Sequence, residues 1–203
     1  MPVTRGFLLR LDAKAGKEAE VEEFLVSSLA LARQELGTVE WFAVRFGRGE
    51  YGIFDVFNDD AGREAHATGE IAKILRTRGP ELLDKVKLEK LDILAEKLPV
   101  GVIEPVTKVL LLTFRAKSGH EGDVETFLRD AKPLVEAEPK TIAWFAFHSE
   151  EGEYGIFDVF PDAHGRFMHL TGQVPRELAK HALTLLGSIP DTHLPEVLAA
   201  KLA

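Results

Sequence analysis

The spacing of apolar side chains divides the chain into one series of elements that occurs twice. Apolar residues alternate with other residues over 7–11 and 110–114, which predicts a strand at the start of each half. Apolar residues at the i, i+3, i+4 and i+7 positions follow over 21–32 and 124–135, and this spacing is typical of an amphipathic helix. Each half is therefore expected to begin with a strand and a helix.

Two aromatic and β-branched blocks come next, separated by a turn that contains glycine. The second block, EYGIFDVF, is identical at residues 50–57 and 153–160, and such paired blocks predict a β-hairpin. Another helix is predicted to begin near Asp59 and Asp162, where a carboxylate can accept backbone N–H bonds. A last strand around LDILAEKL is predicted to close the first half.

The two halves keep one register over most of their length, and Trp41 has its counterpart 103 positions later in Trp144. The order βαββαβ predicts an α+β chain of two tandem ferredoxin-like units, residues 1–100 and 104–203, joined by a linker from Pro99 to Pro105. Such a unit covers only one face of its sheet with helices. We therefore expect the two sheets to face each other and form an intrachain pseudo-dimeric α+β barrel.

Composition narrows the classes of function. The 203 residues are 45% hydrophobic and include no cysteine, which excludes disulfides and thiolate metal sites and fits a reducing compartment. No apolar run approaches the roughly 20 residues that cross a bilayer, so we expect a cytoplasmic protein without a membrane partner. The formal charge of −8 and the scattered Lys and Arg residues argue against nucleic acid.

The blocks WFA and YGIFDVF, followed by D-x-x-G-R-x-x-H-x-T-G, resemble the antibiotic biosynthesis monooxygenase family of dimeric α+β barrel proteins. The resemblance covers nearly all of both halves. It implies a pocket in each half, between the sheet and the second helix or within the barrel. In some members it also implies oxygenation of aromatic polyketides or quinols without a cofactor. Haem-degrading relatives place a tryptophan where Phe57 and Phe160 stand, so neither haem nor another cofactor is expected.

His66 and His169 are the only histidines at equivalent positions in both halves, and we predict them to be catalytic. A histidine can take a proton from a phenolic substrate, as cofactor-free oxygenation requires, because the substrate anion must itself reduce dioxygen. The alternative is a helix histidine that holds a local hydrogen-bond network. No metal site is expected, because His164, the nearest other histidine to His169, is Ala61 in the first half.

Asp55 and Asp158 lie inside predicted strands, where aspartate is disfavoured, so each requires a partner. Either could orient the histidine or bind a hydroxyl group of a ligand. Pairing with an arginine such as Arg63 or Arg166, or contact with water between the sheets, is favoured because buried carboxylates are usually paired. Both arginines are also candidates for binding an anionic group at a helix start.

Four aromatic residues complete the predicted substrate site. Trp41 and Trp144 could form a wall for a planar ligand, although core packing or contact between the halves explains them equally well. Tyr51 and Tyr154 place a hydroxyl near the hairpin turn. The literal GRGEYG at 47–52 joins two predicted strands, so we interpret it as a hairpin turn and not as a dinucleotide site.

Two classes of function remain open from the sequence. The first is a cofactor-independent monooxygenase that acts on a small planar aromatic or quinol-type substrate, with His66 or His169 as the base. The second is a non-catalytic barrel that binds a small molecule or has a structural role. A small aromatic molecule is the expected partner in the first case, and association of two chains through barrel–barrel contacts stays open.

Overall fold

The computed structural model describes residues 2–101 and 105–203. The linker predicted from Pro99 to Pro105 includes residues 102–104, which lie outside these ranges, as does the predicted start of the second domain at residue 104. Helices and antiparallel strands make up the described chain, which confirms the predicted α+β class.

The order of elements is similar in both halves of the chain, but the second half has two short helices in place of the first helix and one more strand at its end. In the first half the order is β1 (Arg5–Ala13), α1 (Glu18–Ala32), β2 (Thr38–Gly47), β3 (Glu50–Phe57), α2 (Asp60–Ala67), α3 (Glu70–Leu82) and β4 (Leu83–Lys97). In the second half it is β5 (Lys108–Phe114), α4 (Glu121–Asp130), α5 (Lys132–Glu136), β6 (Ala143–Ser149), β7 (Tyr154–Phe160), α6 (Ala163–Leu170), α7 (Gln173–Leu185), β8 (Asp191–His193) and β9 (Glu196–Lys201).

Two compact units are present, and their boundaries differ from the predicted ones. The first unit extends to Leu91 and also contains Pro195–Ala203, whereas the second is Asp92–Leu194. The predicted domains, 1–100 and 104–203, assigned each closing strand to its own half. In the structure the end of β4 belongs to the second unit and β9 belongs to the first.

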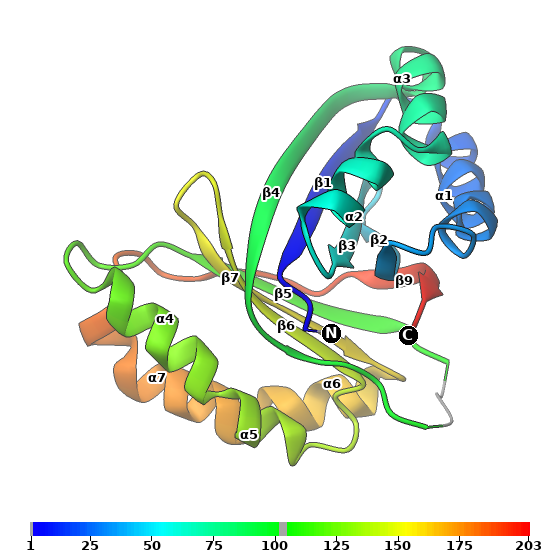
Figure 1. Ribbon diagram of the computed structural model, residues 1–203. Coiled ribbons are helices and arrows are strands. Elements are labelled where there is room, and N and C mark those ends of the chain that lie inside the picture. The colour runs from blue at the N-terminus through cyan, green and yellow to red at the C-terminus, as the bar shows by residue number, and fades with distance from the viewer. Residues whose placement is uncertain (1, 102–104) are drawn as a thin grey trace. The chain divides into compact units, whose positions relative to one another are not determined.

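In the first unit the strand order is β4-β1-β3-β2-β9. Helices α1, α2 and α3 lie on one face of this sheet (Figure 1). Trp41 and Ala43 of β2 pack under the helices with Phe24 and Leu25, and Phe42 therefore points to the opposite face. The core packing thus places the Trp41 face of the hairpin against the helices.

In the second unit the end of β4 is followed in the sheet by β6, β7, β5 and β8. The register repeats that of the first unit, since Trp144 lies opposite Asp158 as Trp41 lies opposite Asp55. One difference is local. The long helix α1 corresponds to two short helices, α4 and α5, and Pro133 stands where α1 has Ala30.

Predicted helix starts and turns are confirmed. Asp59 and Asp162 are the N-cap residues of α2 and α6, and each carboxylate accepts the N–H of the glycine three residues on. The GRGEYG segment is a hairpin turn with Gly49 at φ +79°, a conformation that favours glycine. In each half the predicted second helix is instead two helices. Gly69 and Gly172 are the N-cap residues of the additional helices, α3 and α7.

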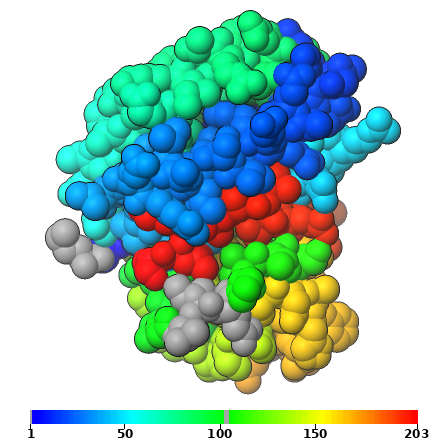
Figure 2. Space-filling view, turned by 90° about the vertical axis from the view of Figure 1, so that its right-hand side faces the viewer, coloured from blue at the N-terminus to red at the C-terminus, as the bar shows by residue number. Residues whose placement is uncertain are grey.

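The closing strands carry equivalent lysines that bind the ends of helices. Lys201 of β9 donates to the carbonyl oxygens of Ala32, Glu35 and Thr38 at 3.1, 2.8 and 2.6 Å. Figure 2 shows the C-terminal residues, in red, directly against the blue surface of α1. Lys97 of β4 donates in the same way to carbonyl oxygens at the end of α5. A cation suits this position, because helix C-termini leave carbonyl groups unpaired and carry partial negative charge.

Within the part of the chain that the structure describes, no helix is both long and apolar enough to cross a membrane. The longest helix, α1, has 15 residues. It also carries Glu18 and Glu20 in its first turn.

We expect Lys201→Met to lower the free energy of unfolding by about 1–2 kcal/mol, because it removes charge-assisted hydrogen bonds to carbonyl groups at the end of α1. Lys73→Met is the matched control, since Lys73 forms an exposed pair with Glu70 and should change stability by less than about 0.5 kcal/mol. Urea denaturation of both variants measures the difference. Equal losses would contradict the anchoring role of Lys201.

A second prediction concerns the fragment 1–100. It keeps the β2 edge that β9 occupies in the full chain, and it keeps residues 92–97, which lack their partner strand there. We therefore expect the fragment to self-associate, as measured by light scattering, because an unpaired strand edge is a template for pairing. The peptide PEVLAAKLA, residues 195–203, should reduce this association by occupying the β2 edge. A monomeric fragment would show that the closing strands are dispensable.

Candidate functional site

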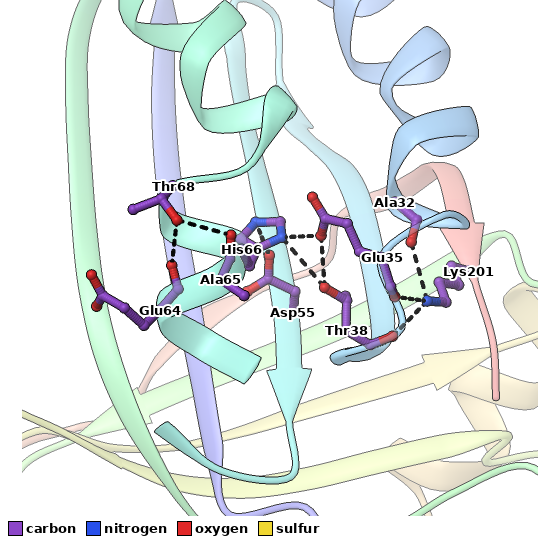
Figure 3. Close-up of polar contacts among 9 residues, drawn as sticks. All are labelled: Ala32, Glu35, Thr38, Asp55, Glu64, Ala65, His66, Thr68 and Lys201. Atoms are coloured by element: carbon purple, nitrogen blue, oxygen red, sulfur yellow. Dashed lines mark hydrogen bonds and ion pairs between the residues drawn. The ribbon is translucent and has the colours of Figure 1, made fainter. Parts of the chain in front are cut away.

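The imidazole of His66 lies between two carboxylates in the first unit (Figure 3). Its Nδ1 is 2.5 Å from Glu35 Oε2, and its Nε2 is 3.0 Å from Asp55 Oδ2. Only 9% of the His66 side chain and 2% of the Asp55 side chain are exposed. Both ring nitrogens are thus engaged by acceptors inside the protein.

Three segments that are distant in sequence bring this cluster together. Asp55 comes from the middle of β3, His66 from the last turn of α2, and Glu35 from the turn after α1. Thr38 donates its hydroxyl to Glu35 Oε2 at 2.8 Å and fixes that carboxylate. The approach of α2 needs glycine at 62, because a Cβ there would lie 3.0 Å from the carbonyl oxygen of Gly37.

The two carboxylates determine the charge of the histidine. Burial alone would lower the pKa of His66, but the charges and hydrogen bonds of Asp55 and Glu35 outweigh it and raise the pKa to about 10. The ring is therefore an imidazolium at neutral pH, with both N–H groups donating. This charge state argues against the predicted role of His66 as the group that first accepts a proton.

The carboxylates themselves are shifted in opposite directions. Burial alone would raise the pKa of Glu35, but hydrogen bonding and charge from His66 outweigh it, so the pKa of Glu35 is lowered. For Asp55, burial dominates and raises the pKa even though the His66 charge opposes it. Asp55 is therefore the better proton store of the two, and Glu35 is the group that stays ionised.

A cavity of about 300 Å³ opens onto the Glu35 end of the cluster. Its lining includes Glu35, Thr38 and His66 together with Leu31, Leu36 and Ala65. Asp55 lies behind the imidazole ring, on the side of the sheet. A ligand in this cavity would thus meet Glu35 first and reach Asp55 only through His66.

The second unit repeats the cluster with a longer contact. His169 Nδ1 is 2.6 Å from Glu138 Oε2, but His169 Nε2 is 3.6 Å from Asp158 Oδ1, which is beyond hydrogen-bond distance. Burial raises the pKa of Asp158 to about 7, and neither of its oxygens has a hydrogen-bond partner in the described chain. Lys140 replaces Gly37 and Met168 replaces Ala65, so larger side chains stand at the corresponding opening.

The predicted tryptophans lie in the cores and not in the cavity. Trp41 and Trp144 are fully buried under the helices of their units, which agrees with the packing alternative. Their Nε1 atoms have no hydrogen-bond acceptor among the described residues, although each lies on the strand pair that carries the site aspartate. These side chains therefore do not form an aromatic wall for a ligand.

The predicted tyrosines belong to other networks. Tyr51 donates its hydroxyl to Glu22 Oε1 at 3.0 Å, and burial together with Glu22 raises its pKa to about 12. Arg45 pairs with the same glutamate. Tyr154 stacks on His148 with ring centroids 4.6 Å apart. Neither tyrosine lines the cavity beside His66.

The arginine pairing predicted for the aspartates is wrong for Asp55, whose partner is His66. Arg63 instead pairs with Asp60 at 2.6 Å on the same helix. Arg166 donates to the carbonyl oxygens of Val109 and Leu194. The suggestion that the aspartate orients the histidine describes the first unit better.

Sequence reasoning missed Glu35 and Glu138, although a signal existed. Both glutamates recur at the spacing of the repeat, each followed three residues later by threonine, as E-x-x-T in both halves. They lie between predicted elements, where acidic residues are common, so their position alone does not indicate a functional role. Among residues 2–101 and 105–203 no cluster of side chains is arranged to hold a metal ion, and the imidazole ring separates Glu35 from Asp55.

We expect the His66 ring to stay doubly protonated as the pH is raised from about 6 to about 9, which nitrogen-15 NMR of the imidazole can measure. The pKa of His66 is raised in the folded state, so the stability it contributes is complete below about pH 6.5 and is lost as the pH rises toward 10. Glu35→Gln should lower this pKa because it removes one stabilising charge. A neutral ring near pH 7 in the unmodified protein would contradict the charge assignment.

Solved structures with the same fold span this chain from end to end. Two of them are named "Putative monooxygenase". The one from Fusobacterium nucleatum subsp. nucleatum has a TM-score of 0.87 at 13% identity and covers 98% of this chain and 94% of its own. The one from Lactobacillus acidophilus has a TM-score of 0.84 at 11% identity, with 99% and 97% covered. An anthrone oxidase-like protein has a TM-score of 0.66 at 9% identity, with 100% and 97% covered.

These likenesses concern the fold alone, because the identities are between 9% and 13%. No protein-family model matches the chain, and no curated protein matches it either. The chain therefore shares its α+β fold, over its whole length, with structures named "putative monooxygenase" and "anthrone oxidase-like protein".

Proposed function

We propose that the first unit carries the active site of a cofactor-independent monooxygenase that acts on a planar hydroxylated aromatic compound of the anthrone or quinol type. The observation that carries this proposal is the contact of one histidine with two carboxylates, Glu35 and Asp55, whose pKa values are shifted in opposite directions. The cavity at the Glu35 end and the names of the structurally similar proteins support it.

The cluster moves a proton inward in this proposal. A substrate hydroxyl gives its proton to the ionised Glu35. The loss of that negative charge lets Nε2 of the His66 imidazolium release its own proton to Asp55, while Nδ1 keeps its hydrogen. The 2.5 Å contact couples the charge of Glu35 to the ring, and the 3.0 Å contact allows the transfer from Nε2 to Asp55. Glu35, His66 and Asp55 all end neutral, because Glu35 holds the proton of the substrate and Asp55 holds the proton of Nε2, and the substrate becomes an anion in the cavity.

The substrate anion then reacts with dioxygen without a further reductant. It transfers one electron to dioxygen, and the substrate radical and superoxide combine to form a peroxide at a carbon that carries a second hydrogen. Glu35 gives its proton to the peroxide and Asp55 returns its proton to Nε2 of His66, which restores the cluster. The remaining hydrogen leaves that carbon as a proton, and the O–O bond breaks with loss of water. A CH₂ group and O₂ thus become a carbonyl group and H₂O.

The second unit serves a supporting role in this proposal. Its relay is open at the 3.6 Å contact between His169 and Asp158. Lys140 and Met168 stand where the first unit has Gly37 and Ala65. We further propose that both units derive from one duplicated ferredoxin-like unit; the shared registers and the equivalent Lys97 and Lys201 contacts support this.

A second candidate function is binding without turnover. The burial of the cluster favours it, because the hydrogen bonds of His66 are already satisfied by Glu35 and Asp55 without a ligand. In that case the cluster only holds α2 against the sheet, and the cavity accepts a small apolar molecule.

Paired substitutions in the two units test the enzymatic proposal, with oxygen uptake measured on anthrone and on a hydroquinone. Glu35→Gln and Asp55→Asn should each reduce kcat by at least about 100-fold, because each interrupts the proton relay. Glu138→Gln and Asp158→Asn are the matched controls and should change kcat by less than about threefold. Circular dichroism and the His66 NMR signals identify variants that lose the fold.

The outcomes separate the two functions. Equal losses in both units would overturn the assignment of the active site to the first unit. Anthrone binding without oxygen uptake by the unmodified protein would support the non-catalytic alternative. A Glu35→Gln variant that keeps full turnover would remove the relay from the mechanism.

A further inference from the structure

A groove of about 540 Å³ runs between α4, α5 and α7 of the second unit. Figure 1 shows these helices side by side, on the side of the unit away from the strands. The floor is apolar and is formed by Phe127, Val174 and Leu185. His169 is not among its lining residues, so the groove is separate from the carboxylate–histidine cluster.

The first unit contains an internal comparison. The equivalent space between α1 and α3 holds only about 10 Å³, although Phe24 matches Phe127 and Leu82 matches Leu185. Ile74 and Leu75 pack against the core there. The space between the helices therefore has an equivalent apolar floor in both units, but it is open only in the second.

Two sequence changes explain the opening. Glu177 replaces Ile74, so a charged side chain that extends toward water stands where an apolar one fills the space. Pro133 replaces Ala30 and lacks the N–H that would continue the helix, so the chain breaks between α4 and α5 beside the groove. Both changes widen the gap to α7.

The rim of the groove is acidic. Asp123, Asp130 and Glu177 line it, and neither lysine nor arginine is among the described residues of its lining. His120 pairs with Asp123 at 2.8 Å and Lys180 pairs with Glu177 at 2.6 Å, both on exposed surface. No side chain in the described chain pairs with Asp130.

An aromatic surface lies next to these carboxylates. The rings of Phe127 and His181 are 5.6 Å apart at an angle of 56°, and both line the groove. An aromatic face attracts a cation that lies over it, and carboxylates within reach add to that attraction. The combination of an apolar floor, an aromatic face and an acidic rim is complementary to a flat organic cation.

We propose that this groove binds a small planar organic cation, such as a quaternary aromatic ammonium compound. The apolar ring system lies on Phe127 and the floor, and the charge lies near Asp130 and Glu177. This site does not depend on the oxygen chemistry proposed for the first unit.

Amide NMR spectra of the full chain, titrated near neutral pH, test the proposal. The probe is N-methylquinolinium, and quinoline is the neutral control with the same rings. We expect N-methylquinolinium to shift the signals of α4 and α7 saturably and to bind at least about fivefold more tightly than quinoline. Equal affinities would overturn the cation assignment, and shifts confined to other elements would overturn the site.

Two substitutions at one position separate shape from charge. Glu177→Ile restores the residue of the first unit, should fill the groove, and should reduce the affinity for N-methylquinolinium at least about tenfold without loss of the fold. Glu177→Gln keeps the size and should reduce the affinity only about two- to fivefold. The reverse change in the first unit, Ile74→Glu, is the matched control and should leave the affinity unchanged. Undiminished binding by Glu177→Ile would overturn the proposal.

Discussion

The charged ring of His66 lies between Glu35 and Asp55, and this buried contact holds the first unit together at the point where three elements meet. A buried imidazolium is stable only while both carboxylates stay in place, since removal of one partner of a buried ion pair costs about 3–5 kcal/mol. The end of α1, the middle of β3 and the last turn of α2 are therefore fixed relative to one another. Any chemistry at the cavity depends on that arrangement.

Strand β9 lies at the end of the second half but belongs to the first unit, so this constraint includes the C-terminal residues of the chain. Lys201 binds the carbonyl oxygen of Glu35, the same residue whose side chain holds His66. The strand that carries Lys201 pairs with β2, although about 100 residues of the second unit lie between them in the sequence. The site of the first unit is thus completed by the last residues of the second half, and Lys97 makes the equivalent contact in the other direction.

The two units share a scaffold and differ at a few positions. The core tryptophans, the aspartate caps and the E-x-x-T turns are the same in both. The openings differ, because Lys140 replaces Gly37 beside one histidine and Pro133 replaces Ala30 beside the outer groove. Such changes leave the sheet intact, since they lie in turns and on helix surfaces that face away from the strands.

Periodicity, capping and repetition are local signals, so the sequence alone determined the α+β class, the order of elements and the caps at Asp59 and Asp162. It could not assign the closing strands, since a strand pattern carries no label for its partner, and β9 pairs with the other half. Nor could it join Glu35 to His66 or settle the protonation of the ring. Burial and charge at that contact arise only when distant segments meet, and only the tertiary structure decides which segments do.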